Sequence, residues 1–301
     1  MKDNQIFKGV FSALVTPLTA DGRINVDAVS ALVEHQLAAG LDGFYVCGGT
    51  GEGVALTEAQ RRQMTEAAIA ANKGRGRIVV HVGAMHPKEA FALAEHAREC
   101  GADGVSSIPP SIYFSYTEDE TVDYYQTLAS HARLPLLVYR TASLNAGNML
   151  SLMCKLLKSD YICGLKYTGL SYYEMWKFLQ LNEGNINVVN GADETLLCGF
   201  VTGAQAGIGA VYNLIPEVYV RLYRAFQAGD IKEAKRCQDV ICGVIASLGR
   251  FIRGAGIILP LKEALNGLGF NVGLPAYPVQ GLPQDVHEQL MAAFNQASGK
   301  F

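Results

Sequence analysis

The sequence predicts an α/β protein, a (β/α)₈ TIM barrel followed by a C-terminal helical extension. Eight short apolar runs alternate with longer helix-patterned segments, at intervals of roughly 20 to 35 residues, the length of one strand, one helix and two loops. The runs are apolar almost throughout, as in parallel strands that are buried on both faces. The expected strands are 9–15, 43–46, 77–82, 104–108, 135–139, 162–166, 186–190 and 206–210.

Helix start signals stand between these strands. Thr57 with Gln60 and Thr117 with Glu120 have the spacing of a capping box, and Pro87 stands at a first helical position. An open doubly wound sheet is the alternative fold. It is less favoured because the first strand is not followed by the glycine fingerprint of dinucleotide-binding folds.

The segment after the eighth strand predicts three more helices, at 215–228, 231–253 and 259–268. The last two exceed what a barrel needs. We therefore expect residues 1–230 to form the catalytic barrel and residues 231–301 to form a helical extension packed on it.

Composition excludes two classes of partner. The 301 residues include 25 basic and 28 acidic side chains, a net charge of −3, and the basic residues are scattered. Neither a nucleic-acid backbone nor an anionic membrane is an expected partner of such a surface. The N-terminus lacks the apolar core of a signal peptide, so the cytoplasm is the expected compartment.

The cysteines and histidines predict no metal site. The seven cysteines form no C-x-x-C pair, and most of them are expected to be buried, reduced thiols. The six histidines form neither H-x-H nor H-E-x-x-H. Any chemistry is therefore expected to come from ordinary side chains.

Lys166 is the strongest catalytic candidate. The active site of an α/β barrel lies at the carboxyl ends of the strands, and Lys166 ends the sixth strand after the apolar run 162–165. A lysine there loses hydration, which favours the neutral, nucleophilic amine that Schiff-base chemistry on a ketone requires. A structural ion pair with a carboxylate in the barrel is an equal alternative.

Tyr139 ends the fifth strand, next to the sixth. Adjacent strands lie about 4.8 Å apart, so its phenol is expected to exchange a proton with a substrate bound at Lys166. The alternative is a core tyrosine whose hydroxyl is satisfied within the protein.

Two further strand ends carry polar residues. Residues 48–52, Gly-Gly-Thr-Gly-Glu, offer backbone N–H groups and the Thr50 hydroxyl, which suit one small carboxylate, although such a stretch is more often a plain turn. Residues 190–194 carry Asp193 and Glu194, which suit a polyol; the alternative is a pair of helix N-terminal acids stabilised by the helix dipole.

Together, Gly48–Glu52, Tyr139 and Gly164–Thr168 resemble the dihydrodipicolinate synthase and N-acetylneuraminate lyase superfamily, and the resemblance covers nearly the whole chain. It implies a class I aldolase, generally tetrameric, in which a lysine forms an imine with pyruvate and no cofactor is needed. The implied imine-forming lysine is Lys166, and the implied proton-transferring tyrosine is Tyr139.

Within the superfamily, the chain most resembles the branch of the N-acetylneuraminate lyases. The synthase branch has an arginine five residues after the tyrosine, where this chain has Leu144. In the lyase branch, the positions that hold the sugar match Thr168, Gly191, Asp193 and Glu194. The implied reaction is cleavage of N-acetylneuraminate to N-acetylmannosamine and pyruvate. The alternatives are an aldolase of a 2-keto-3-deoxy sugar acid, a dihydrodipicolinate synthase, and a non-catalytic binding protein on the same scaffold.

Several positions depart from the superfamily pattern. Gly49 and Thr50 match the site for the pyruvate carboxylate, but Gly49 stands where a serine or threonine is usual, which leaves Thr50 alone to relay the proton with the tyrosine. Ala210 replaces a serine that contacts the sugar. Arg140 replaces an asparagine and offers a new contact for an anion. Tyr113 is the nearest match to a tyrosine that faces a neighbouring subunit.

Overall fold

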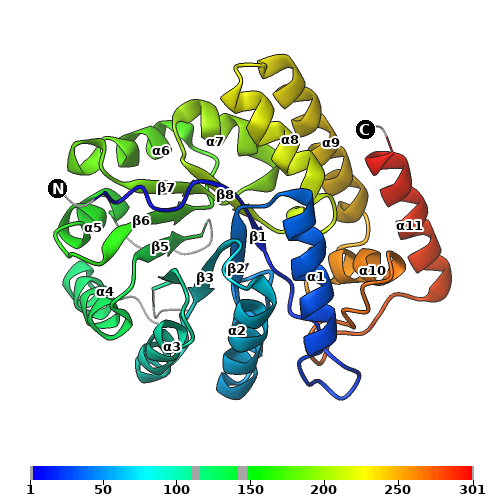
Figure 1. The fold of residues 1–301 in the computed structure, drawn as a ribbon, viewed down its shortest axis with the longest axis horizontal. Coiled ribbons are helices and arrows are strands. Elements are labelled where there is room, and N and C mark those ends of the chain that lie inside the picture. Colours follow the sequence, from blue (N-terminus) through cyan, green and yellow to red (C-terminus); the bar gives the residue numbers. More distant parts are fainter. Residues whose placement is uncertain (1–2, 110–115, 142–147, 300–301) are drawn as a thin grey trace. The chain divides into compact units, whose positions relative to one another are not determined.

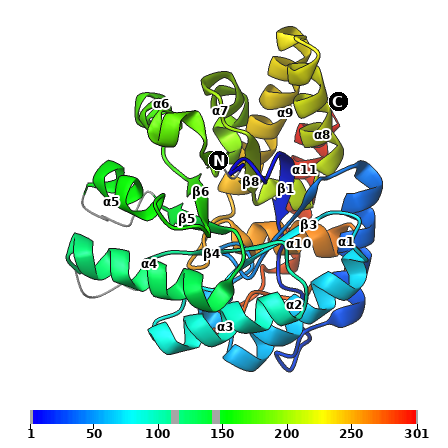
Figure 2. The same ribbon diagram turned by 60° about the vertical axis from the view of Figure 1, so that its left-hand side comes forward.

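A computed structural model describes residues 3–109, 116–141 and 148–299 and confirms the expected fold class (Figures 1 and 2). Eight strands form a closed barrel in the order β1-β2-β3-β4-β5-β6-β7-β8. Each strand begins within one residue of its expected start. The strands are Gly9–Ala13 (β1), Gly43–Val46 (β2), Arg77–His81 (β3), Gly104–Ser107 (β4), Leu136–Arg140 (β5), Ile162–Tyr167 (β6), Asn187–Asn190 (β7) and Ala206–Gly209 (β8).

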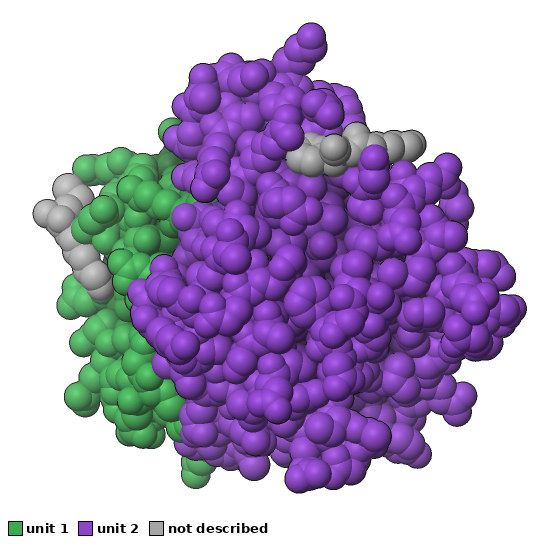
Figure 3. All heavy atoms as spheres, turned by 45° about the vertical axis from the view of Figure 1, so that its right-hand side comes forward, with its two compact units in different colours: residues 1–9, 77–208 green, residues 10–76, 209–301 purple. Residues whose placement is uncertain are grey.

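The chain forms two compact units, coloured separately in Figure 3. Unit 1 comprises residues 1–9 and 77–208, and its helices α3 to α7 lie outside its strands (Figure 1). The helical elements of unit 1 are Pro87–Glu99 (α3), Glu118–Ala132 (α4), Met149–Leu156 (α5), Tyr172–Leu179 (α6), Leu181–Gly184 (η2), Asp193–Thr195 (η3) and Leu196–Thr202 (α7).

Unit 2 comprises residues 10–76 and 209–301. Its helices α8 and α9 lie side by side, and α11 packs against α9 (Figure 1). The helical elements of unit 2 are Val26–Ala39 (α1), Gly53–Ala55 (η1), Glu58–Asn72 (α2), Val211–Asn213 (η4), Pro216–Gln227 (α8), Ile231–Gly249 (α9), Ile258–Gly267 (α10) and Gln284–Ser298 (α11).

The capping signals work as expected. The Thr57 hydroxyl accepts from the Gln60 backbone N–H at the start of α2, and the Gln60 side chain accepts from the Thr57 N–H. Thr117 and Glu120 make the same reciprocal pair at the start of α4. Each box satisfies N–H groups that a helix terminus would otherwise leave without partners. These local signals account for the accuracy of the predicted helix starts.

The C-terminal helix α11 was not identified from the sequence. Its buried residues are Leu290 and Phe294, too few to produce a clear helical period, and Pro283 at its N-cap makes no side-chain capping hydrogen bond. Its packing against α9 and α10 is what stabilises it. The sequence also placed the end of α9 too late, because the helix ends at Gly249.

The expectation that most cysteines are buried is wrong. All seven are free thiols, but only three are buried, two are half-buried, and Cys154 and Cys198 are exposed. Both exposed thiols lie in apolar helical segments, and the helical period turns them to the solvent face.

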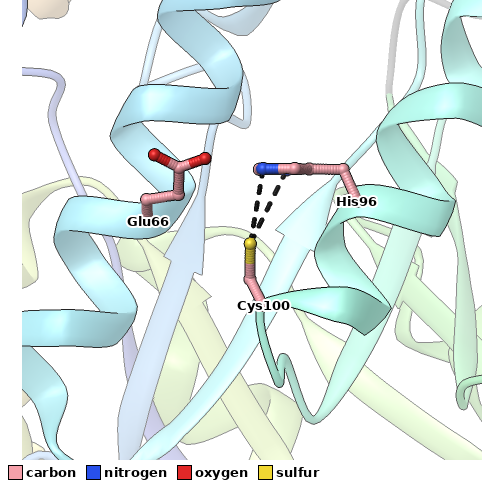
Figure 4. A group of neighbouring side chains, drawn as sticks. All are labelled: Glu66, His96 and Cys100. Atoms are coloured by element: carbon pink, nitrogen blue, oxygen red, sulfur yellow. Dashed lines mark hydrogen bonds between the residues drawn. The ribbon is translucent and has the colours of Figure 1, made fainter.

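One of the half-buried thiols lies next to a histidine. The Cys100 Sγ lies 3.3 Å from the His96 Nε2, one helical turn away in α3 (Figure 4). Glu66, also drawn there, belongs to unit 2. Two side chains are fewer than the three or four protein ligands of a zinc site, so this pair by itself makes no metal site in unit 1.

Among the described residues, no helix has both the length and the apolar character needed to cross a bilayer.

Candidate active site

The structure brings Lys166 and Tyr139 together in unit 1. They occupy opposite positions in the register between β5 and β6. Only 4% of Lys166 is exposed, and its Nζ lies 4.4 Å from the centroid of the Tyr139 ring. A buried amine beside a phenol combines a nucleophile with a group that can transfer protons, which is what imine chemistry on a carbonyl requires.

His81, at the end of β3, packs against the Tyr139 ring in a T-shaped arrangement. The two ring centroids are 6.0 Å apart and the planes cross at 87°. The Ile108 backbone N–H donates to His81 Nε2 at 3.3 Å, and this bond restricts the orientation of the ring. Gly83 makes room for the ring, because a Cβ there would lie 3.0 Å from His81 Cε1 and 2.9 Å from Ser107 Oγ.

His81 was not among the site residues predicted from the sequence. The signal that indicates its position is its place at the end of a barrel strand, the same criterion that selected Lys166 and Tyr139.

Thr168 and Gly191 meet beyond the ends of β6 and β7. The Thr168 Oγ1 is buried and has no hydrogen-bond partner among the described residues. A Cβ on Gly191 would overlap this oxygen, so glycine is required there. The Gly191 N–H donates to the Tyr167 carbonyl at 2.8 Å, and this bond holds the segments that follow β6 and β7 close together. A buried hydroxyl of this kind is suited to a hydrogen bond with a polar ligand.

Asp193 and Glu194 lie in the short helix η3, but their exposure differs. Asp193 is buried, with 8% of its surface exposed, whereas Glu194 is exposed. The preceding turn is fixed by Asn190, whose side-chain amide donates to the Ala192 carbonyl at 2.7 Å. The two acids expected to act together are therefore in different surroundings, one buried and one at the surface.

In unit 2, the loop 47–53 follows β2 and is held in one shape. The Gly53 N–H donates to the Gly48 carbonyl at 3.0 Å, and the Thr16 hydroxyl donates to the Gly51 carbonyl at 2.6 Å. Within this frame, residue 49 is exposed and residue 50 is half-buried. A loop fixed in this way can present its polar groups to a ligand without first having to be ordered.

A buried ion pair links this loop to the C-terminal helices. The Lys262 Nζ of α10 lies 3.0 Å from the Glu52 carboxylate and donates to the Leu274 carbonyl at 2.7 Å. The other Glu52 oxygen accepts from the Ala276 N–H at 2.6 Å. Burial lowers the pKa of Lys262, and the Glu52 charge opposes that effect. The sequence did not reveal this pair, because its members are 210 positions apart.

Two glycines of the loop are expected to respond oppositely to alanine. No described atom lies within 4 Å of a Cβ placed on Gly49. Gly49→Ala should therefore raise the free energy of unfolding by about 0.4–1 kcal/mol, because alanine lowers the conformational entropy of the unfolded chain. A Cβ on Gly53 would overlap the Cys47 carbonyl, so Gly53→Ala should lower that free energy by more than about 1 kcal/mol. Urea denaturation measures both, and equal effects would contradict this loop geometry.

The remaining expected residues have different outcomes. Arg140 was expected to contact an anion, but its guanidinium already lies 3.2 Å from the Glu174 carboxylate of α6, which compensates its charge. Ala210 is half-buried after β8, in unit 2. Tyr113 and Leu144 lie outside the described residues.

Comparison with known proteins identifies the family. The profile of the Dihydrodipicolinate synthetase family matches residues 6–297. The chain belongs to this family. It is 34% identical over 290 residues to a protein of Rhizobium meliloti named N-acetylneuraminate lyase, covering 96% of this chain and 94% of that protein. A protein of the same name from Citrobacter koseri is 31% identical over 261 residues, with 86% of each chain covered.

Solved structures of the family have the same fold. The N-acetylneuraminate lyase of Proteus mirabilis superposes with a TM-score of 0.89 at 26% identity, covering 97% of this chain and 98% of that chain. The sialic acid aldolase of Ruminococcus gnavus gives a TM-score of 0.91 at 25% identity, with 98% and 99% covered. The resemblance inferred from the strand-end motifs is confirmed.

Proposed function

We propose that the protein is a class I aldolase, a carbon–carbon lyase that cleaves N-acetylneuraminate to N-acetylmannosamine and pyruvate. The observation that carries the proposal is the buried Lys166 amine, 4.4 Å from the centroid of the Tyr139 ring. The choice of substrate is supported by relatives named N-acetylneuraminate lyase, which match this chain over most of its length.

In this mechanism, Lys166 attacks the C2 ketone of the open-chain substrate, and loss of water gives a protonated imine. The imine cation accepts electrons. As Tyr139 takes the proton of the C4 hydroxyl, the C3–C4 bond breaks, the aldehyde sugar leaves, and an enamine of pyruvate remains. Protonation of the enamine at C3 and hydrolysis of the imine then release pyruvate and regenerate the free lysine.

The binding roles follow from the family resemblance. Gly49 and Thr50 hold the pyruvate carboxylate, and Thr50 relays the proton with the tyrosine. Thr168, Gly191 and the acids Asp193 and Glu194 hold the sugar. The buried Thr168 Oγ1 supports this assignment, because it has no partner among the described residues and can bond a sugar hydroxyl.

We further propose that the reaction needs neither a metal ion nor another cofactor, because the imine supplies the positive charge that a metal supplies in other aldolases.

We also propose that residues 1–230 form the catalytic barrel and that residues 231–301 support it. The buried ion pair between Glu52, in the loop after β2, and Lys262, in α10, is one contact that supports this role.

The protein is also proposed to be a cytoplasmic homotetramer. Exposed large apolar side chains on α6, on α7 and just before α6 support assembly, since such side chains often mark protein contacts. These side chains and their exposed fractions are Leu170 (68%), Tyr173 (69%), Trp176 (49%) and Val201 (64%).

A substrate panel tests the proposed reaction. We expect pyruvate release, followed with a coupled lactate dehydrogenase assay, to be fastest with N-acetylneuraminate. Faster release from a 2-keto-3-deoxy sugar acid would instead favour the aldolase alternative. Synthase activity without lyase activity would favour dihydrodipicolinate synthase, and a complete lack of turnover would favour a binding protein.

A further inference from the structure

Arg140, Glu174 and Tyr167 form a cluster behind the candidate active site. Arg140 is opposite Tyr167 in the register of β5 and β6, one position beyond the pair Tyr139 and Lys166. Successive residues of a strand point to opposite faces, so the cluster lies on the helix side of these strands. The contact of Arg140 with Glu174, which lies on α6, agrees with that placement.

The three side chains contact one another in a closed triangle. The Arg140 Nη2 lies 3.2 Å from Glu174 Oε2, and the guanidinium carbon lies 5.1 Å from the centroid of the Tyr167 ring. The Tyr167 hydroxyl donates to Glu174 Oε2 at 2.6 Å. Burial, together with this hydrogen bond to the carboxylate, raises the pKa of Tyr167, so the phenol keeps the proton that it donates.

The triangle is connected by the backbone to the residues proposed to act on the substrate. Tyr167 stands between Lys166 and Thr168 in the chain. The Thr168 N–H donates to the Arg140 carbonyl at 2.9 Å, and the Gly191 N–H donates to the Tyr167 carbonyl at 2.8 Å. A shift of the Tyr167 side chain would therefore move the proposed nucleophile and the proposed sugar contacts together.

We infer that Arg140, Glu174 and Tyr167 are positioning residues that fix the ends of β5 and β6, so that the Lys166 amine meets the substrate carbonyl in a reactive orientation. This inference rests on the proposed function. The side chains of Arg140 and Glu174 are only 22% and 30% exposed, so removing either charge leaves a partly buried partner uncompensated. Misplacement of a reacting group by a fraction of an ångström to one ångström is enough to slow an enzyme.

The test measures how fast borohydride traps pyruvate on the lysine. Arg140→Met and Tyr167→Phe are each expected to slow trapping about tenfold, because they loosen the strand end without touching the reacting atoms. The double variant should be no slower than the worse single variant, since the residues act as one unit. Arg140→Lys, which keeps the charge, should recover part of the rate.

A matched control removes an exposed ion pair elsewhere. Lys235 and Asp239 on α9 are 2.7 Å apart and 64% and 63% exposed, so Lys235→Met should trap pyruvate at the wild-type rate. Circular dichroism checks that each variant is folded. If Arg140→Met does not fold, Glu174→Gln provides the second variant, since it keeps an acceptor for the Tyr167 hydroxyl and removes only the charge; it too should slow trapping.

The outcomes separate the two proposals. If the wild-type protein traps pyruvate and no folded variant of the triangle traps it more slowly, the positioning role is overturned but the proposed function is not. Strictly multiplicative effects in the double variant overturn it as well. A wild-type protein that traps no pyruvate overturns the proposed function and the positioning role together.

Discussion

Replacing Lys166 with alanine is expected to lower the rate of pyruvate release at least ~10³-fold, because the variant has no amine with which to form the imine. The side chain is buried against the Tyr139 ring, so a neighbouring lysine is not expected to substitute for it. The measurement is kcat for release from N-acetylneuraminate, with folding checked by circular dichroism.

The control for this variant is Lys235→Ala. Lys235 lies on α9 and its side chain is 64% exposed, so its loss should leave turnover unchanged. A Lys166→Ala rate within about tenfold of the wild type would show that the chemistry does not depend on an imine at this position.

Replacing Tyr139 with phenylalanine is expected to preserve imine formation and to slow cleavage by about 10²- to 10⁴-fold. The phenyl ring keeps its packing against the Lys166 amine and the His81 edge, whereas the hydroxyl that moves the proton is lost. The two effects separate in two assays, pyruvate trapping by borohydride and pyruvate release.

Tyr223→Phe on α8 is the matched control, because it removes a phenol hydroxyl from unit 2 that has no proposed role in the reaction. If Tyr139→Phe cleaved substrate as fast as this control, the tyrosine would not be the proton-transfer group. If it failed to form the imine while remaining folded, the Tyr139 hydroxyl would be needed for imine formation and not for cleavage alone.

The sequence was sufficient to predict the barrel because its signals are local. Strands such as 43–46 and 206–209 are buried along their whole length, so continuous apolar runs mark them directly. Capping residues such as Thr57 mark helix starts through contacts three residues away. Helix α11 has neither a side-chain N-cap nor a wide apolar face, and it was missed.

The paired candidates of the site were predictable for a related reason. In a parallel barrel, residues that end adjacent strands are neighbours, so Lys166 and Tyr139 could be paired before their distance was known. The pairing of Glu52 with Lys262 and of Arg140 with Glu174 depends on where distant helices pack. No spacing rule encodes such contacts.

The most direct test of the central claim is to incubate the protein with pyruvate and borohydride and to map the adduct by peptide mass spectrometry. Imine chemistry predicts one reduced pyruvate adduct per chain, on the peptide that contains Lys166, and none when borohydride is added without pyruvate. The absence of an adduct, or its location on another lysine such as Lys262, would contradict the assignment.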